Sequence, residues 1–197
     1  MAYGKLHWRC GEKVYFLTST QELVMLDFRH KLSDPGFVSV VHRMEKMIDF
    51  FFVMETRKLL LLDSEGRLES HKVKGAKCTI HNVIELSAIG KDGDTEFKTN
   101  SLVANRETII VAGNFGNVPD MHMLMFKRNM KHLNTCVVSN RDAVIGASNY
   151  AHRMKFFRSK SRHTFLFAMS LFSLVHVLAV QYDKLVFLTS FRLTASK

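Results

Sequence analysis

The chain has 197 residues, of which 47% are hydrophobic and 23% charged, and its formal net charge is +10. This composition is too apolar for an intrinsically disordered protein, and the length suits one sizeable domain better than two. We therefore expect a single folded domain over residues 1–197, whose positive charge favours acidic partners such as proteins, nucleic acids or anionic lipids.

The three cysteines, Cys10, Cys78 and Cys136, lie far apart in the sequence and form no CxxC pair. An odd number of isolated cysteines, with no secretory segment at residues 1–10, is typical of free thiols in a reducing compartment. The sequence therefore predicts an intracellular protein of the cytoplasm or nucleus.

Short apolar runs separated by polar turns recur along the chain, and the clearest begin at Lys13, Ile48, Thr108, Ala143 and Lys184. They are rich in β-branched and aromatic residues, which predicts strands and no long helix. Because the runs are continuously apolar, we expect sheets that are covered on both faces. The residues expected in the core are Phe50, Phe52, Ile110, Val144, Ile145, Val186 and Phe187.

The distance between successive runs is uneven. From Ala143 to Leu185 it is about forty residues, which is the period of a four-stranded propeller blade. Residues 68–100 make a longer interval, which we interpret as an insertion with a hairpin turn at residues 91–94.

The repeated unit resembles a WD-repeat blade. In residues 137–158 (VVSNRDAVIGASNYAHRMKFFR), Asp142, residues 146–148 and the pair at 156–157 fall where such blades carry equivalents, and residues 177–190 form a second copy. The resemblance implies an all-β, propeller-like stack of about four small antiparallel sheets, or blades, plus a partial fifth. It also implies a non-enzymatic scaffold for protein–protein interaction.

No group of residues in the sequence predicts catalysis, a cofactor or a metal site. His71 and His81 flank Cys78, but zinc ligands have tighter spacings, so we interpret Cys78 as a partly buried cysteine between surface histidines. Residues 113–116 lack the lysine and the following helix of a phosphate-binding loop, and residues 92–96 lack the later ligands of a calcium loop.

The densest basic segment is residues 152–163 (HRMKFFRSKSRH). Its cations, which we expect to form an exposed edge that binds an acidic protein partner, are Arg153, Lys155, Arg158, Lys160 and Arg162. Phe156 and Phe157, between them, are expected in the core. Two other interpretations remain open: a nucleic-acid-binding surface, or an edge strand that is merely solvated and kept from aggregating by its cations.

A smaller basic cluster, made of Lys127, Arg128, Lys131 and His132, joins this edge if the two blades are neighbours.

Residues 164–182 (TFLFAMSLFSLVHVLAVQY) contain no formally charged side chain and follow the basic segment, as a membrane anchor would. Ser170, Ser173 and His176 interrupt this stretch, and polar groups are costly at the bilayer centre. The favoured interpretation is two buried strands that meet near residues 170–173, and a single-span membrane protein with a basic cytoplasmic portion is the alternative.

The last apolar run, residues 184–190, is followed by too few residues to complete a blade. We therefore expect that the chain does not close a ring by itself. An open edge with Leu185, Phe187 and Phe191 would then pair with another chain, or continue in a longer protein.

Overall fold

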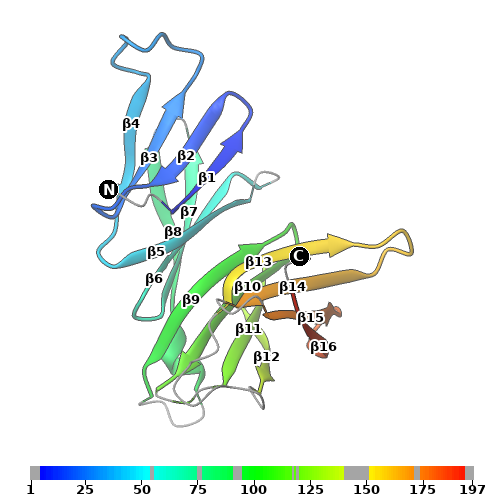
Figure 1. Ribbon diagram of the computed structural model, residues 1–197. Coiled ribbons are helices and arrows are strands. Elements are labelled where there is room, and N and C mark those ends of the chain that lie inside the picture. Colours follow the sequence, from blue (N-terminus) through cyan, green and yellow to red (C-terminus); the bar gives the residue numbers. More distant parts are fainter. Residues whose placement is uncertain are drawn as a thin grey trace. The chain divides into compact units, whose positions relative to one another are not determined.

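The computed structural model describes residues 5–53, 56–74, 77–90, 95–116, 118, 120–139, 151–170 and 174–193, without the side chains of residues 5–10 and 152. These residues form four separate antiparallel sheets of four strands each, which confirms the all-β, blade-like fold (Figure 1). Every sheet is a meander, because each strand pairs only with its neighbours in the sequence. The chain divides into two compact units, Met1–Glu85 and Leu86–Lys197.

The first unit contains two of the sheets. The first sheet consists of β1 (Lys5–Cys10), β2 (Lys13–Leu17), β3 (Glu22–Asp27) and β4 (Val38–Arg43). The second sheet consists of β5 (Met47–Val53), β6 (Lys58–Asp63), β7 (Arg67–Lys74) and β8 (Lys77–Glu85).

The core of the first unit lies between its two sheets. The ring of Tyr15 on β2 stacks on that of Phe52 on β5, with the ring centroids 5.5 Å apart. Phe50 and Leu59 belong to the same cluster, and both are buried. Burial of this much apolar surface is the main stabilising term of such a unit, because each fully buried large side chain contributes about 1.5–3 kcal/mol.

The second unit contains a 3-10 helix, η2 (Leu86–Ile89), and the other two sheets. The third sheet consists of β9 (Phe97–Ala104), β10 (Thr108–Phe115), β11 (Met121–Lys127) and β12 (His132–Val138). The fourth sheet consists of β13 (Ala151–Arg158), β14 (Thr164–Ser170), β15 (Leu174–Val180) and β16 (Leu185–Arg192).

The strand β10 is buried along nearly its whole length, as the continuous apolar run predicts. Gly113 is required there, because a Cβ atom at this position would come within 2.5 Å of the carbonyl oxygen of Lys98. Within the unit, β9 lies against β13 and β12 lies against β16. The two sheets of the second unit therefore contact each other along both of these strand pairs.

The grouping of strands into blades differs from the sequence-based interpretation. Residues 68–100 are not an insertion, because they contain β8, nearly all of β7 and the first half of β9. The run at Lys184, expected to open a partial fifth blade, forms β16, the fourth strand of the fourth sheet. No described strand of one sheet pairs with a strand of another, so no described sheet combines strands from both chain ends.

The predicted core residues have different outcomes in the two units. Phe50, Phe52 and Ile110 are buried as expected, and Val186 is half-buried. The prediction for Phe187 is wrong: the side chain is 41% exposed, because β16 is an edge strand. Val144 and Ile145, and Asp142 and residues 146–148 of the WD-like copy, lie outside the described residues.

The apolar stretch 164–182 forms two strands, β14 and β15, which pair antiparallel. Among the described residues, no helix has both the length and the apolarity to cross a membrane. The two-strand interpretation of this stretch is therefore confirmed.

The edge strand β16 exposes several apolar side chains, including Phe187, Leu188 and Phe191. Leu185, which we expected at the open edge, is buried instead. Association of this edge with another chain stays a prediction.

Candidate functional site

The hairpin of β13 and β14 carries the basic segment that the sequence singles out. The two strands pair from Ala151 with Ser170 to Arg158 with Thr164, and the turn between them is residues 159–163. The turn is closed by a hydrogen bond from the Ser159 amide to the His163 carbonyl oxygen (2.9 Å), and Arg162 has a φ of 66°. This tight turn holds the cations of residues 160 and 162 at the outer end of the hairpin.

All five predicted partner-binding cations, Arg153, Lys155, Arg158, Lys160 and Arg162, are exposed. On β13 they alternate with the half-buried side chains of Met154 and Phe156, as expected for a strand with one covered face. The expectation that Phe157 lies in the core is wrong: this side chain is 56% exposed, because it shares the open face with Arg153 and Lys155.

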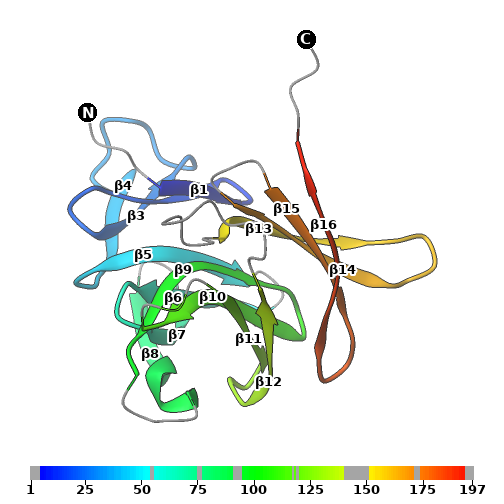
Figure 2. The ribbon, with the colours of Figure 1, turned by 60° about the horizontal axis from the view of Figure 1, so that its bottom comes forward.

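The turns of neighbouring hairpins in the second unit lie at one end of its sheets. In a meander, alternate turns lie at the same end, which groups residues 105–107 with 128–131 and residues 159–163 with 181–184. The two groups meet, because the ammonium group of Lys127 lies 5.2 Å from the ring centroid of Tyr182. In Figure 2 the β13–β14 hairpin, in yellow and orange, extends beyond the other strands of its sheet.

We call this end of the second unit the basic end. It is formed by Arg106, Lys127, Arg128, Lys131, Arg158, Lys160, Arg162 and Lys184. All of these side chains except the half-buried Lys127 are exposed, and none has a carboxylate within 4.0 Å among the described residues. The only acidic residues in the same described turns are Glu107 and Asp183. Unpaired like charges on one surface add to a positive field that attracts acidic groups.

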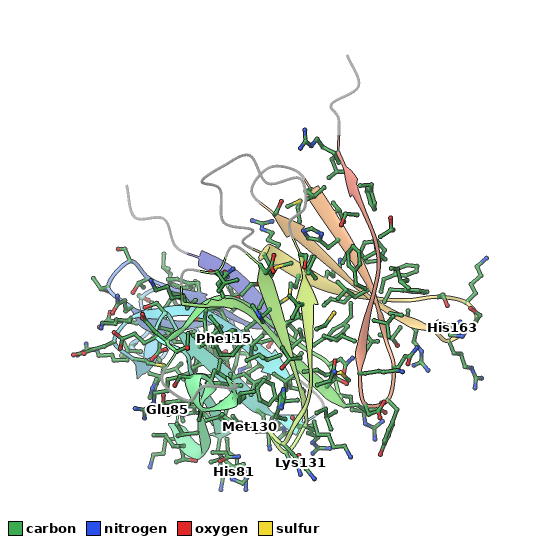
Figure 3. The ribbon with its side chains drawn as sticks, turned by 90° about the horizontal axis from the view of Figure 1, so that it is seen from below. His81, Glu85, Phe115, Met130, Lys131 and His163 are labelled. Carbon is green, nitrogen blue, oxygen red and sulfur yellow. The ribbon has the colours of Figure 1, made fainter. Side chains whose placement is uncertain are left out.

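The structure thus brings Lys127, Arg128 and Lys131 to the same end as the tip of the β13–β14 hairpin. Figure 3 shows Lys131 and His163 at the outer ends of their hairpins. His132 does not add to this charge, because burial lowers the pKa of its imidazole, whose ring packs against that of Phe126.

Sequence reasoning missed Arg106 and Lys184, which stand alone in the sequence between apolar runs. Each residue lies in a turn or next to one, and the meander order places these turns at the basic end. A correct assignment of the strands to their sheets would therefore have identified both residues.

His71 and His81, which flank Cys78 in the sequence, do not form a metal-binding group with this cysteine among the described residues. His81 on β8 is exposed, and the charges of Lys58 and Lys72 lower the pKa of its imidazole. Cys78 is half-buried, and burial, helped by the charge of Glu69, raises the pKa of its thiol to about 11. His71 is not a surface histidine: it is 0% exposed, and its Nε2 lies 2.7 Å from a Glu69 oxygen.

The two loops considered for phosphate or calcium are not supported as binding sites. Gly113 and Asn114 belong to β10, where the Asn114 amide donates to the carbonyl oxygen of Asp120 (2.8 Å). Residues 92 and 94 lie outside the described part of the chain, and Glu96 is exposed.

Comparisons with known proteins place the fold but no family. No protein-family model matches the chain, and no curated protein matches it. Solved structures that are similar include the β-propeller domain of Cps50 (Swd1) from Myceliophteria thermophila, at 10% identity over 86% of this chain and 51% of that chain, with a TM-score of 0.54. The N-terminal domain of Nup159 matches at 14% identity over 93% of this chain and 51% of that chain, with a TM-score of 0.56.

A third similar structure is the periplasmic gluconolactonase PpgL of Pseudomonas aeruginosa, at 10% identity over 91% of this chain and 51% of that chain, with a TM-score of 0.60. The chain spans about half the length of each of these proteins. At such identities the likeness shows the propeller-like fold alone.

The gluconolactonase corrects one sequence-based prediction. The WD-like resemblance implied that the chain is not an enzyme, and that inference is wrong, because a protein with the same kind of fold is an enzyme. A propeller-like fold supports both interaction platforms and catalysts, so function has to be argued from the surface of this chain.

Proposed function

We propose that this chain binds a protein partner with an acidic surface, and that the basic end of the second unit is the binding surface. The observation that carries the proposal is that four hairpin turns lie at one end of the sheets of the second unit, and that their cations have no described carboxylate partner. Cations that pair within a protein mainly stabilise its fold, whereas unpaired cations at the tips of hairpins remain available to a partner.

The chemistry of the basic end favours a protein partner. Tyr182 is 84% exposed and Phe157 is 56% exposed, and both lie among the arginines and lysines. Tyrosine and arginine are enriched at the energetically dominant positions of protein interfaces. Lys127 lies over one face of the Tyr182 ring, and that face is therefore closed to a stacking nucleic-acid base.

The comparisons add one supporting fact about a similar fold. A solved structure of S. cerevisiae Dbp5 bound to Nup159 is among those that resemble this chain, at 13% identity over 93% of this chain and 50% of that chain, with a TM-score of 0.59. That structure concerns Nup159, and it shows that a fold of this kind is used to hold another protein.

The test uses the full chain and a fluorescent peptide rich in glutamate and aspartate. The variant with Lys160→Glu and Arg162→Glu reverses two cations at the hairpin tip. A matched control with Lys31→Glu and Lys77→Glu makes the same change of net charge at exposed lysines of the first unit. We expect the tip variant to bind about tenfold more weakly at low ionic strength and to show a smaller salt dependence, while the control binds as the wild type does.

Equal losses in the two variants would show that net charge alone attracts the peptide, and the proposal would be wrong. A single-stranded RNA measured in parallel tests the alternative. Tighter binding of RNA than of peptide, lost in the tip variant only, would identify the basic end as a nucleic-acid surface instead.

A further inference from the structure

Three side chains of metal-binding type lie together inside the first unit. They are His42 on β4, and Glu69 and His71 on β7. Their donor atoms all lie within 4.8 Å of one another. Glu69 and His71 are buried, and the His42 side chain is 22% exposed. The two strands belong to different sheets, so the cluster exists only in the folded unit.

The distances in the cluster are close to those of a metal site. The Glu69 Oε2 atom lies 2.7 Å from Nε2 of His71 and 3.9 Å from Nε2 of His42. Around a tetrahedral zinc ion, with bonds of about 2.0–2.2 Å, donor atoms are separated by about 3.4 Å. The two observed distances lie on either side of this value, so small side-chain movements bring the three donors into coordination geometry.

The two oxygens of Glu69 have different neighbours. Oε1 accepts a hydrogen bond from Nε of Arg67 at 2.8 Å, while Oε2 faces the two imidazoles. Such an outer contact fixes the direction of a ligating carboxylate. Arg67 also balances the charge of Glu69, and for this reason we expect weaker binding than at zinc sites built from thiolates.

The hydrogen bonds in the cluster do not account for the burial of His71. Its ring is fully buried, and its Nδ1 atom has no hydrogen-bond partner among the described residues. A neutral imidazole has one donor and one acceptor nitrogen, so one of them is unsatisfied in either tautomer. A buried polar atom without a partner costs about 1–3 kcal/mol. The nitrogen that faces Glu69 is Nε2, so an ion bound there leaves the proton on Nδ1, and the free energy of coordination has to offset this cost.

From this geometry we infer that His42, Glu69 and His71 bind a divalent transition-metal ion of the zinc class. Two imidazoles and one carboxylate suit Zn²⁺, Co²⁺ or Ni²⁺, whereas Mg²⁺ and Ca²⁺ prefer sites made of oxygen atoms alone. Three protein ligands leave a fourth position for water. The partly exposed ring of His42 is the side from which an ion enters.

The test is titration of the chelator-treated full chain with Zn²⁺, followed by calorimetry, and with Co²⁺, followed by its visible absorption. We expect one tight ion per chain and a cobalt spectrum typical of nitrogen and oxygen ligands. His42→Ala is expected to weaken binding by roughly 10- to 100-fold. His81→Ala, at an exposed histidine on β8, is the matched control and is expected to bind as the wild type does.

Thermal unfolding provides a second measurement that does not depend on one variant. At the same concentration, Zn²⁺ is expected to raise the unfolding midpoint of the wild type and of His81→Ala more than that of His42→Ala or Glu69→Gln, because an ion that binds only the folded state stabilises it to an extent that rises with its affinity. Equal affinity of His42→Ala and wild type would overturn the inference. A strong thiolate-to-cobalt band would also overturn it, since it would replace this ligand set with one that contains a cysteine.

Discussion

The strands β7 and β13 carry similar charged sequences, RLESHKVK and AHRMKFFR, but their ionisable groups lie in opposite environments. β7 lies between β6 and β8, and Glu69 and His71 are buried and paired with each other. β13 is an edge strand, and its cations are exposed. The comparison teaches that the place of a strand in its sheet, rather than its charge, decides whether ionisable side chains pair within the fold or remain available to a partner.

The largest expected difference between the two regions is in their aromatic side chains. Phe52→Ala removes a ring that is 4% exposed and stacked on Tyr15, and we expect it to lower the free energy of unfolding by about 3–5 kcal/mol. Phe157→Ala, at the exposed face of β13, is expected to change it by less than about 0.5 kcal/mol. Urea unfolding followed by circular dichroism measures both, and similar losses would remove the contrast between the two environments.

The second difference concerns the charged groups themselves. Glu69→Ala leaves the buried His71 and the guanidinium of Arg67 without their shared partner, and we expect a loss of about 1–3 kcal/mol in chelator-treated protein. Lys155→Ala removes a solvated cation and is expected to change stability by less than about 0.5 kcal/mol. If Glu69→Ala lowered the free energy of unfolding as little as Lys155→Ala, water would already satisfy the hydrogen bonds of the cluster. The ionisable groups of β7 would then be as well solvated as those of β13.

A smaller difference is expected between the turns that adjoin the two strands. Oδ1 of Asp63 accepts hydrogen bonds from the amides of Glu65 (2.9 Å) and Arg67 (2.8 Å), which fixes the turn into β7. Asp63→Ala should therefore cost about 1 kcal/mol. In the exposed turn after β13, Ser159→Ala removes two exposed hydrogen bonds, one from the His163 amide and one with the Ser161 hydroxyl, and should cost about half as much. Equal costs in thermal unfolding would show that burial does not strengthen the first turn.

The smallest expected effect is in the pH dependence of stability. Burial lowers the pKa of His176, whose Nδ1 lies 2.7 Å from the Ser190 hydroxyl. Below about pH 6.5 the unfolded chain binds a proton at His176, whereas the folded chain does not. The free energy of unfolding therefore falls as the pH is lowered below this value, and above it His176 has no effect on the pH dependence. His176→Gln should reduce the slope of the unfolding free energy between about pH 6.5 and 5.

The control for this slope is Gln181→Ala, at an exposed residue without an ionisable side chain. It is expected to leave the slope as in the wild type, because no titrating group is changed. An unchanged slope in His176→Gln would mean that the buried imidazole takes up its proton as readily in the folded chain as in the unfolded one.

The sequence predicted the strands well, because a short apolar run between turn residues is a local signal. It could not predict which runs share a sheet: residues 184–190 are as apolar as residues 13–17, yet one run is an edge strand and the other an inner strand. For the same reason Phe187 was misplaced. The five cations of residues 152–163 were visible as a local cluster.

The cluster of His42 with Glu69 was not visible in the sequence. Its members lie on strands of different sheets, and no regular spacing connects them. The residues come together only because the first two sheets pack on each other. The sequence places His71 near Cys78 and His81, where we expected no metal site, and gives no sign of His42 or Glu69.

The meander order of the sixteen described strands has a consequence for how the chain folds. Each hairpin closes a short loop, for which the entropic cost is small. Each described strand pairs only with strands that neighbour it in the sequence, so no pairing depends on a distant part of the chain. Topologies dominated by such local pairing fold faster than other β-proteins of similar size. During synthesis the first sheet is complete once β4 has left the ribosome, and within each unit the later sheet then assembles on the earlier one.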